Sequence, residues 1–197
     1  MKETTLPPKP TTRAARPELV RLPRHTFLRR VYRAILHVLI RIIVRLFARV
    51  QITGIENVPP TGPVLMVTNP LGDADAIVGM AYTPRPVDLI AKIDLYDLPI
   101  AGRLIDAYGV IWIHRGQPDR RALRAALQGL KEGRVIGIAP EGRESLSGSL
   151  EEGTQGAAFL ALKSGAPLLP VTFTGSENSR VFPNLRRLRR TEITCTV

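Results

Sequence analysis

From Val50 onward the chain alternates between short apolar runs and amphipathic stretches. Apolar runs of about four to eight residues predict strands, and apolar residues spaced three and four apart predict helices. The predicted strands are Val64–Thr68, Val87–Ala91, Val110–His114, Val135–Ala139 and Leu168–Thr174. The predicted helices lie near Asp73–Tyr82, Pro99–Tyr108, Pro118–Lys131 and Thr154–Lys163. This alternation predicts an α/β domain over residues 51–197, with a central mixed sheet covered by helices.

A different pattern precedes this domain in residues 27–50, FLRRVYRAILHVLIRIIVRLFARV. Basic residues recur every four positions, which places them on one stripe of a helix. They are Arg29, Arg33, His37, Arg41, Arg45 and Arg49. A helix that crosses a bilayer needs about 20 mostly uncharged residues, and no apolar run here exceeds three. The pattern therefore favours an N-terminal amphipathic helix in a membrane interface. The alternative is a helix packed on the protein with its basic face in solvent.

Composition and charge divide the chain in the same way. Residues 1–26 are rich in Pro, Thr and Arg, which predicts a disordered basic tail, and they carry no secretory signal. Of the net charge of +11, residues 1–50 carry +10 and residues 51–197 carry +1. Basic residues alternate with aliphatic rather than aromatic ones, which favours an anionic membrane surface over nucleic acid as the partner. We expect a peripheral membrane protein on the cytoplasmic face.

The C-terminal stretch, residues 186–197, combines basic residues with a strand. Its sequence RRLRRTEITCTV enters a strand where the sequence stops, so we expect a domain truncated at the C-terminus. Its arginines, Arg186, Arg187, Arg189 and Arg190, fit a solvated turn and a patch facing phosphate or lipid equally well. The single cysteine, Cys195, excludes an internal disulfide framework and a cysteine-based zinc site. We expect it to be an ordinary small strand residue.

Four short stretches border predicted strands, where open α/β sheets place their sites. They are NPLGDAD from Asn69, GVIWIHR from Gly109, APEGRES from Ala139 and GAPLLPV from Gly165. Each stretch alone has a simpler explanation. Asp73 and Asp75, for example, suit the start of a helix as a cap and a first-turn acid.

In their order, spacing and residues, the four stretches resemble the motifs of the glycerolipid acyltransferases, the family of lysophosphatidic acid acyltransferases. The resemblance covers roughly residues 35–197. The family's first motif, Asn-His-x-x-x-x-Asp, falls on Asn69 and Asp75, with Pro70 at the histidine position. The second motif, Gly-x-x-x-x-x-Arg, falls on Gly109 and Arg115.

The third and fourth motifs complete the resemblance. The third, Phe-Pro-Glu-Gly-Thr-Arg-Ser, matches at Pro140, Glu141, Gly142 and Ser145 and departs at Ala139, Arg143 and Glu144. The departure leaves the position of the phosphate-binding arginine in this loop open by one residue. The fourth, a proline-rich entry to a strand, falls on Pro167 and Pro170.

The resemblance implies a reaction of phospholipid biosynthesis. An acyl chain passes from acyl-CoA or acyl carrier protein to the hydroxyl of a lysophospholipid such as 1-acylglycerol 3-phosphate, without a cofactor or metal. In the family the first-motif histidine is the general base, and the aspartate, here Asp75, orients it. An imidazole so oriented can take the proton of a hydroxyl that attacks a thioester. The substrate-binding residues that the resemblance implies are Asn69, Pro70, Gly72, Asp73, Arg115, Glu141, Gly142 and Arg143.

Pro70 has no ionisable group, so we expect the activity of this sequence to be impaired. His114 is a candidate for a replacement base, but strand alternation turns it away from the face of Arg115. Asp73 could act only as a weak carboxylate base. The alternative function is a non-catalytic protein that binds lipid at a membrane.

Overall fold

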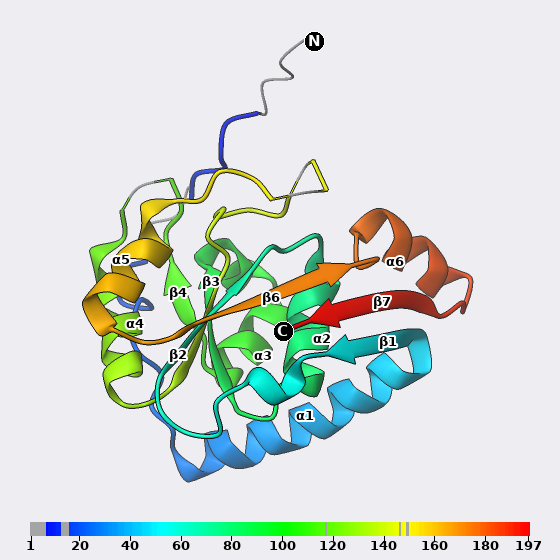
Figure 1. The fold of residues 1–197 in the computed structure, drawn as a ribbon, viewed down its shortest axis with the longest axis horizontal. Coiled ribbons are helices and arrows are strands. Elements are labelled where there is room, and N and C mark those ends of the chain that lie inside the picture. Colours follow the sequence, from blue (N-terminus) through cyan, green and yellow to red (C-terminus); the bar gives the residue numbers. More distant parts are fainter. Residues whose placement is uncertain (1–6, 13–15, 117, 146, 149) are drawn as a thin grey trace.

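The computed structural model describes residues 7–12, 16–116, 118–145, 147–148 and 150–197. Within these residues one mixed sheet of seven strands has the order β1-β7-β6-β2-β5-β3-β4 (Figure 1). The strands are β1 Ala48–Thr53, β2 Val64–Thr68, β3 Val87–Lys92, β4 Ile111–Ile113, β5 Val135–Ile138, β6 Leu168–Thr174 and β7 Thr191–Thr196. The α-helices are α1 Phe27–Phe47, α2 Asp73–Tyr82, α3 Ala101–Tyr108, α4 Arg120–Lys131, α5 Gln155–Ser164 and α6 Asn178–Arg186. Two short 3₁₀ helices, η1 Ile55–Asn57 and η2 Ile93–Asp97, complete the described elements.

Strand direction places the loops that carry the motifs at one edge of the sheet. β2 is parallel to β5 and β6, and β3 is parallel to β5 and β4. β7 runs antiparallel to β6 and parallel to β1. The carboxyl ends of β2 to β6 therefore share one edge with the starts of β1 and β7. The predicted α/β class and its central mixed sheet are confirmed.

Two hydrophobic clusters cover the two faces of the sheet. Leu65 and Ile136 belong to the cluster that includes α4 and α5, whereas Val64, Met66 and Val135 belong to the cluster that includes α1 and α2. Neighbouring residues of β2 and β5 thus face opposite layers, as strand geometry requires. Because both faces are covered there, β2 and β5 are almost entirely apolar, whereas β6 alternates buried and exposed residues.

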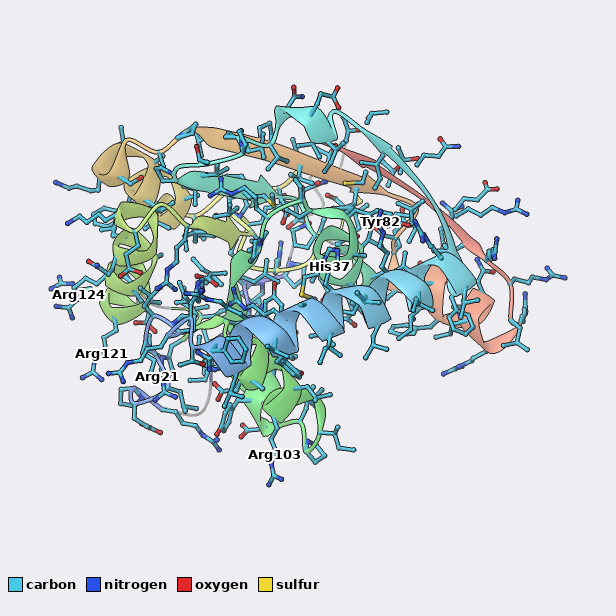
Figure 2. All side chains as sticks on the ribbon, turned by 90° about the horizontal axis from the view of Figure 1, so that it is seen from below. Arg21, His37, Tyr82, Arg103, Arg121 and Arg124 are labelled. Carbon is cyan, nitrogen blue, oxygen red and sulfur yellow. The ribbon has the colours of Figure 1, made fainter. Side chains whose placement is uncertain are left out.

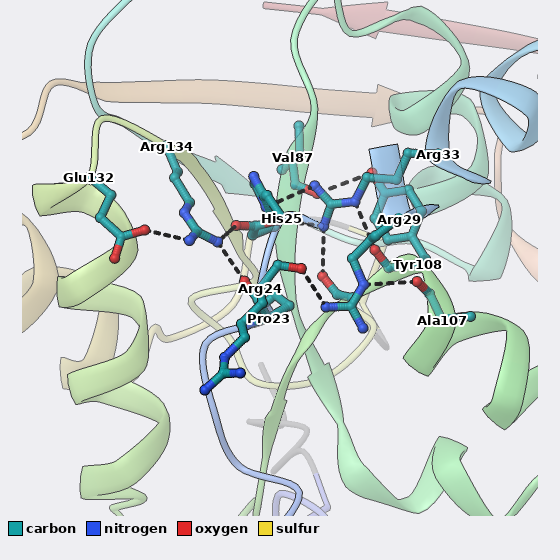
Figure 3. Close-up of polar contacts among 12 residues, drawn as sticks. Pro23, Arg24, His25, Arg29, Arg33, Val87, Ala107, Tyr108, Glu132 and Arg134 are labelled. Carbon is teal, nitrogen blue, oxygen red and sulfur yellow. Dashed lines mark hydrogen bonds and ion pairs between the residues drawn. The ribbon is translucent and has the colours of Figure 1, made fainter. Parts of the chain in front are cut away.

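Helix α1 is attached to the sheet by a buried group of charges (Figure 3). Asp88 in β3 is 1% exposed, and its carboxylate binds Arg33 at 2.6 Å, Arg134 at 3.1 Å and His25 at 3.2 Å. Arg33 also donates to the carbonyl oxygens of Tyr108 at 2.7 Å and Gly109 at 2.8 Å. Burial lowers the pKa of His25, although the Asp88 carboxylate opposes this shift. Of the basic residues that recur every four positions in α1, Arg33 thus forms a buried ion pair with Asp88, whereas Arg41 and Arg45 are exposed.

The exposed positions of α1 are largely apolar. Arg33 points into the protein, and Arg41 lies 5.5 Å from the ring centre of Tyr82. Large apolar side chains are exposed at Phe27, Leu28, Val31, Ile35, Val38, Leu39, Ile42, Ile43, Leu46 and Phe47. Our alternative prediction was a helix that packs on the protein and leaves its basic face in solvent. In the structure α1 does pack on the protein, but Arg33 of the basic stripe is buried and the exposed side chains are largely apolar. No helix among the described residues meets the length and apolarity that a membrane crossing requires.

The described part of the N-terminal region lies against the domain, which differs from the disordered tail that composition predicts. Val20 is buried in the cluster beside α4, and Arg134 donates to the carbonyl of Pro23 at 2.8 Å. Further along, the Thr12 N–H donates to the carbonyl of Arg115 at 3.0 Å. A few apolar anchors and backbone hydrogen bonds hold this segment, and composition does not register such contacts with distant residues.

Candidate active site

The loop between β2 and α2, residues 69–72, is held by the side chain of Asp75. Asp75 lies in the first turn of α2, where its Oδ2 accepts the N–H groups of Leu71 at 2.5 Å and Gly72 at 3.1 Å. The residue is 3% exposed, and Oδ1 has no hydrogen-bond partner among the described residues. Burial raises the pKa of Asp75, although the two N–H groups and the nearby Ser176 hydroxyl partly offset it. One carboxylate oxygen thus fixes the loop. The other makes no hydrogen bond of good geometry among the described residues, although the Ser176 hydroxyl lies near this carboxylate.

Residues 176–178, which follow β6, hold this loop from the other side. Asn178 Oδ1 accepts the N–H of Asp73 at 3.0 Å, and Asn178 Nδ2 donates to Asp73 and Glu144, both at 3.3 Å. A Cβ at Gly72 would lie 2.6 Å from the carbonyl oxygen of Ser176, so the close approach requires glycine. Sequence reasoning missed Ser176 and Asn178. Their place after the carboxyl end of β6 was the available signal.

Arg115, which follows β4, contacts the loop after β5. Its NH1 donates to the carbonyl of Gly142 at 3.0 Å, and its backbone N–H donates to Thr12 Oγ1 at 2.8 Å. Its Nε is buried and has no hydrogen-bond partner among the described residues. The guanidinium therefore joins the second and third motifs and keeps one donor for another acceptor.

The loop after β5 carries a fully buried acid, Glu141. It is 0% exposed, and neither carboxylate oxygen has a hydrogen-bond partner in the described part of the chain. The following Gly142 has a φ of 71°, a conformation that favours glycine. The N–H of Ser145 donates to the carbonyl of Pro70 at 2.8 Å, which ties this loop to the first motif.

Arg143 in the same loop is already engaged. Its guanidinium forms an ion pair with Glu151 at 2.7 Å and donates to the carbonyl of Pro7 at 2.6 Å. Arg143 is buried, so these contacts satisfy donors that are shielded from water. Of the two motif arginines, only Arg115 has a buried nitrogen without a hydrogen-bond partner among the described residues.

His114 is paired on both ring nitrogens. Nδ1 lies 2.9 Å from Asp119 Oδ2, and Nε2 accepts the backbone N–H of Arg16 at 3.0 Å. Because Nε2 is an acceptor, the proton of the neutral ring lies on Nδ1 and is donated to Asp119. The nitrogen that a replacement base would use is therefore occupied by the N-terminal segment.

The first three motifs meet at the carboxyl edge of the sheet, whereas the fourth supports the sheet itself. Pro170 is level with Val67 of β2, and the carbonyl of Pro167 accepts the N–H of Leu65 at 3.0 Å. Among the described residues, every buried side-chain polar atom without a hydrogen-bond partner lies in the loops after β2, β4, β5 and β6 or in the helix start that follows. These atoms belong to Asn69, Asp75, Arg115, Glu141, Ser176 and Glu177. No group of three or more potential metal ligands was found in the described ranges.

The family model described as Acyltransferase matches residues 49–174. This region contains all of these loops except residues 176–178. The chain belongs to the acyltransferase family. The predicted resemblance to glycerolipid acyltransferases is confirmed by its relatives. A 1-acyl-sn-glycerol-3-phosphate acyltransferase of Borreliella burgdorferi is 31% identical over 133 residues, covering 66% of this chain and 53% of that protein. One of Chlamydomonas reinhardtii is 31% identical over 156 residues, covering 77% of this chain and 46% of that protein.

This acyltransferase chain also has a similar solved fold. The crystal structure of the 1-acyl-sn-glycerophosphate (LPA) acyltransferase PlsC from Thermotoga maritima gives a TM-score of 0.63 at 23% identity. The likeness covers 87% of this chain and 71% of that one, and it concerns the fold. The match spans about half the length of the Borreliella and Chlamydomonas relatives.

Proposed function

We propose that this acyltransferase transfers an acyl chain from acyl-CoA or acyl carrier protein to the hydroxyl of a lysophospholipid such as 1-acylglycerol 3-phosphate, at a membrane surface. The observation that carries the proposal is the gathering of buried, unpartnered polar atoms in the motif loops. Buried polar groups in proteins almost always have partners, and exceptions gather where a ligand is bound or chemistry is done. The acceptor is supported by the names of the relatives, and the membrane surface by the exposed apolar side chains of α1. The two candidate donors follow from the family resemblance of the four motifs.

Arg115 is the group that we assign to the phosphate of the acceptor. Its buried Nε has no hydrogen-bond partner in the described chain, and the Gly142 carbonyl fixes its NH1. Arg143 has a supporting role in this assignment, because Glu151 neutralises it. A guanidinium fixed in this way can donate a charge-assisted hydrogen bond from Nε to a phosphate oxygen.

Pro70 limits the chemistry, because it stands where the resemblance implies a general base. Asp75 Oδ1, buried and without a hydrogen-bond partner among the described residues, suits the N–H of an imidazole. General-base assistance contributes roughly 10²–10⁴ in rate, so we expect transfer by this sequence to be slow. A second function, non-catalytic lipid binding, follows from Pro70 if the loop has lost its catalytic use.

One pair of variants separates these two functions. Pro70→His should raise acyl transfer to 1-acylglycerol 3-phosphate by about two orders of magnitude, measured with both acyl-CoA and acyl carrier protein as donors. Pro70→Ala is the control, because it removes the ring without adding a base, and it should give no such gain. A folded Pro70→His protein that binds lipid without a gain in transfer would favour the non-catalytic function.

The membrane proposal is tested on α1. Leu39→Gln/Ile42→Gln should weaken binding to vesicles that contain anionic phospholipid, because both side chains are exposed and would lose contact with the acyl region. Leu162→Gln on α5 is the control, since Leu162 lies on another helix and is 86% exposed. Point variants are needed because a deletion of residues 1–50 would remove the buried Arg33 and half of β1. Equal binding by both variants and the unchanged protein would count against an interfacial α1.

A further inference from the structure

The end of α6 and the turn that follows form an exposed surface of mixed character, which we call the α6 surface. Its apolar members are Phe182, Leu185 and Leu188, and its basic members are Arg186, Arg187, Arg189 and Arg190, all exposed. Residues 178–191 contain no Asp or Glu. The acids on either side, Glu177 and Glu192, form long ion pairs without hydrogen bonds, at 3.9 Å with Arg180 and at 3.7 Å with Arg49. The α6 surface therefore carries a concentrated positive charge around large apolar groups.

Leu188 is placed at the tip of this surface by an unusual helix ending. The Leu188 N–H donates to the Leu185 carbonyl at 3.1 Å, and the Arg189 N–H donates to the Asn184 carbonyl at 2.8 Å. These two bonds define a Schellman ending, in which the residue at the Leu188 position is left-handed and is usually glycine. Leu188 has a φ of 51° and is 80% exposed. A leucine here strains the backbone and exposes apolar surface.

The α6 surface contacts α1, and the helix that carries it begins at the candidate active site. Arg190 Nε donates to the carbonyl of Leu46, in the last turn of α1, at 3.1 Å. α6 and the C-terminal half of α1 lie at the same end of the molecule in Figure 2. At its other end α6 begins with Asn178, which binds Asp73 in the first motif loop. The turn before β7 also lies at the sheet edge that carries the motif loops.

We propose that the α6 surface is a second docking site for an anionic phospholipid bilayer, separate from the face of α1. Leu188 enters the acyl boundary, and the surrounding arginines contact lipid phosphates. This combination of an apolar tip with a basic rim matches the charge and depth profile of an anionic membrane surface. A single-stranded nucleic acid would instead favour stacking aromatics, and Phe182 is the only aromatic side chain on the α6 surface. The proposal rests on the membrane-surface function and adds a second contact that orients the motif loops toward the bilayer.

A charge-reversal pair tests the basic rim. Arg187→Glu/Arg189→Glu should weaken binding to vesicles of phosphatidylglycerol and phosphatidylcholine by about tenfold or more, since each basic residue near such a surface contributes appreciably. Arg120→Glu/Arg124→Glu changes the net charge equally on α4, at the end opposite α6, where Figure 2 shows Arg121 and Arg124. This control should change binding less than threefold. An equal loss in both variants would mean that only net charge matters and would overturn the proposal.

Leu188→Gly tests the apolar tip without damaging the fold. Glycine suits the left-handed position, so the variant should unfold at a higher temperature than the unchanged protein. It should nevertheless bind the same vesicles more weakly, by about threefold or more, whereas Leu162→Ala should bind them unchanged. Stabilisation with undiminished vesicle binding would overturn the insertion of Leu188.

Both measurements are made without an acyl donor, so slow catalysis does not affect them. If only Leu39→Gln/Ile42→Gln leaves vesicle binding unchanged, the membrane role of α1 is contradicted. If only the α6 variants leave vesicle binding unchanged, only the second docking site is contradicted. If the α6 variants lost binding to total tRNA but kept vesicle binding, nucleic acid would replace the bilayer as the partner of the α6 surface.

Discussion

Asp75 has two carboxylate oxygens with different environments, and each leads to a prediction at the scale of the residue. Oδ2 caps the β2–α2 loop through two N–H groups, whereas Oδ1 is buried without a partner in the described chain. In Pro70→His protein, a further Asp75→Ala change should remove most of the gain in transfer, because an imidazole without an orienting carboxylate loses its tautomer and direction. The rate constant for transfer at saturating substrate checks this coupling. Additive effects of the two changes would show that they act independently.

The raised pKa of Asp75 predicts a pH-dependent stability. Burial favours the protonated carboxyl in the folded protein, so the folded pKa lies above the unfolded value of about 3.9. Its contribution is then fully present below the unfolded pKa and is lost as the pH rises through the folded pKa. The free energy of unfolding of Asp75→Asn, relative to the unchanged protein, should therefore increase as the pH rises above about 4. Urea unfolding at several pH values measures it.

The exposed Asp73→Asn change is the control for this pH series, because it removes one negative charge from the same helix turn. A stability difference between Asp75→Asn and the unchanged protein that stays constant across the range would contradict the assignment of the pH dependence to Asp75.

Among the elements, α1 depends on one buried contact more than its surface pattern suggests. Removing one partner of a buried ion pair costs about 3–5 kcal/mol, because the remaining charge stays buried. Arg33→Leu should therefore lower the free energy of unfolding by about 3 kcal/mol, measured by urea denaturation. Arg45→Leu, an exposed position on the same helix, should change it by less than about 0.5 kcal/mol. Similar values for both variants would show that the group around Asp88 does not anchor α1.

Helices and strands were predicted correctly from the sequence where a local pattern of residues defines them. β2, β6 and α2 have the predicted bounds, since each combines a clear period with flanking breaks. β1 was missed because the apolar α1 runs into it without a break, and only pairing with β7 makes residues 48–53 a strand. α6 was missed because Pro183 lies within it and its residues are polar or basic.

At the scale of the whole molecule, Cys195 reports on opening of the sheet. It lies in β7 and is buried, and burial, with the nearby Asp75 charge, raises the pKa of its thiol to about 11. We expect Cys195 to react with a thiol reagent at pH 8 far more slowly than a free cysteine does. The rate should rise with urea in step with unfolding. Fast labelling of the native protein would show that the β7 side of the sheet opens independently.

The site residues that lie in the sequence motifs could be predicted. Those that come from distant parts of the chain could not. Asn69, Asp75, Arg115 and Glu141 were found from the sequence and contain buried polar atoms without hydrogen-bond partners in the described structure. Asn178 escaped because it reaches Asp73 across 105 residues of chain. The engagement of Arg143 by Glu151, and of His114 by Arg16, likewise depends on folded contacts that no spacing rule encodes.

The pairing of β1 with β7 has a consequence for the order of events during synthesis. Thr53 and Thr196 face one another in the register although they are 143 residues apart. Contacts of such long range form late, because the intervening chain must first be made and brought together. α1, with its apolar side chains, leaves the ribosome well before β7 can fix β1 beside it. A nascent chain thus exposes the apolar side chains of α1 while its sheet is incomplete, so the bilayer contact that we propose for α1 would precede completion of the fold.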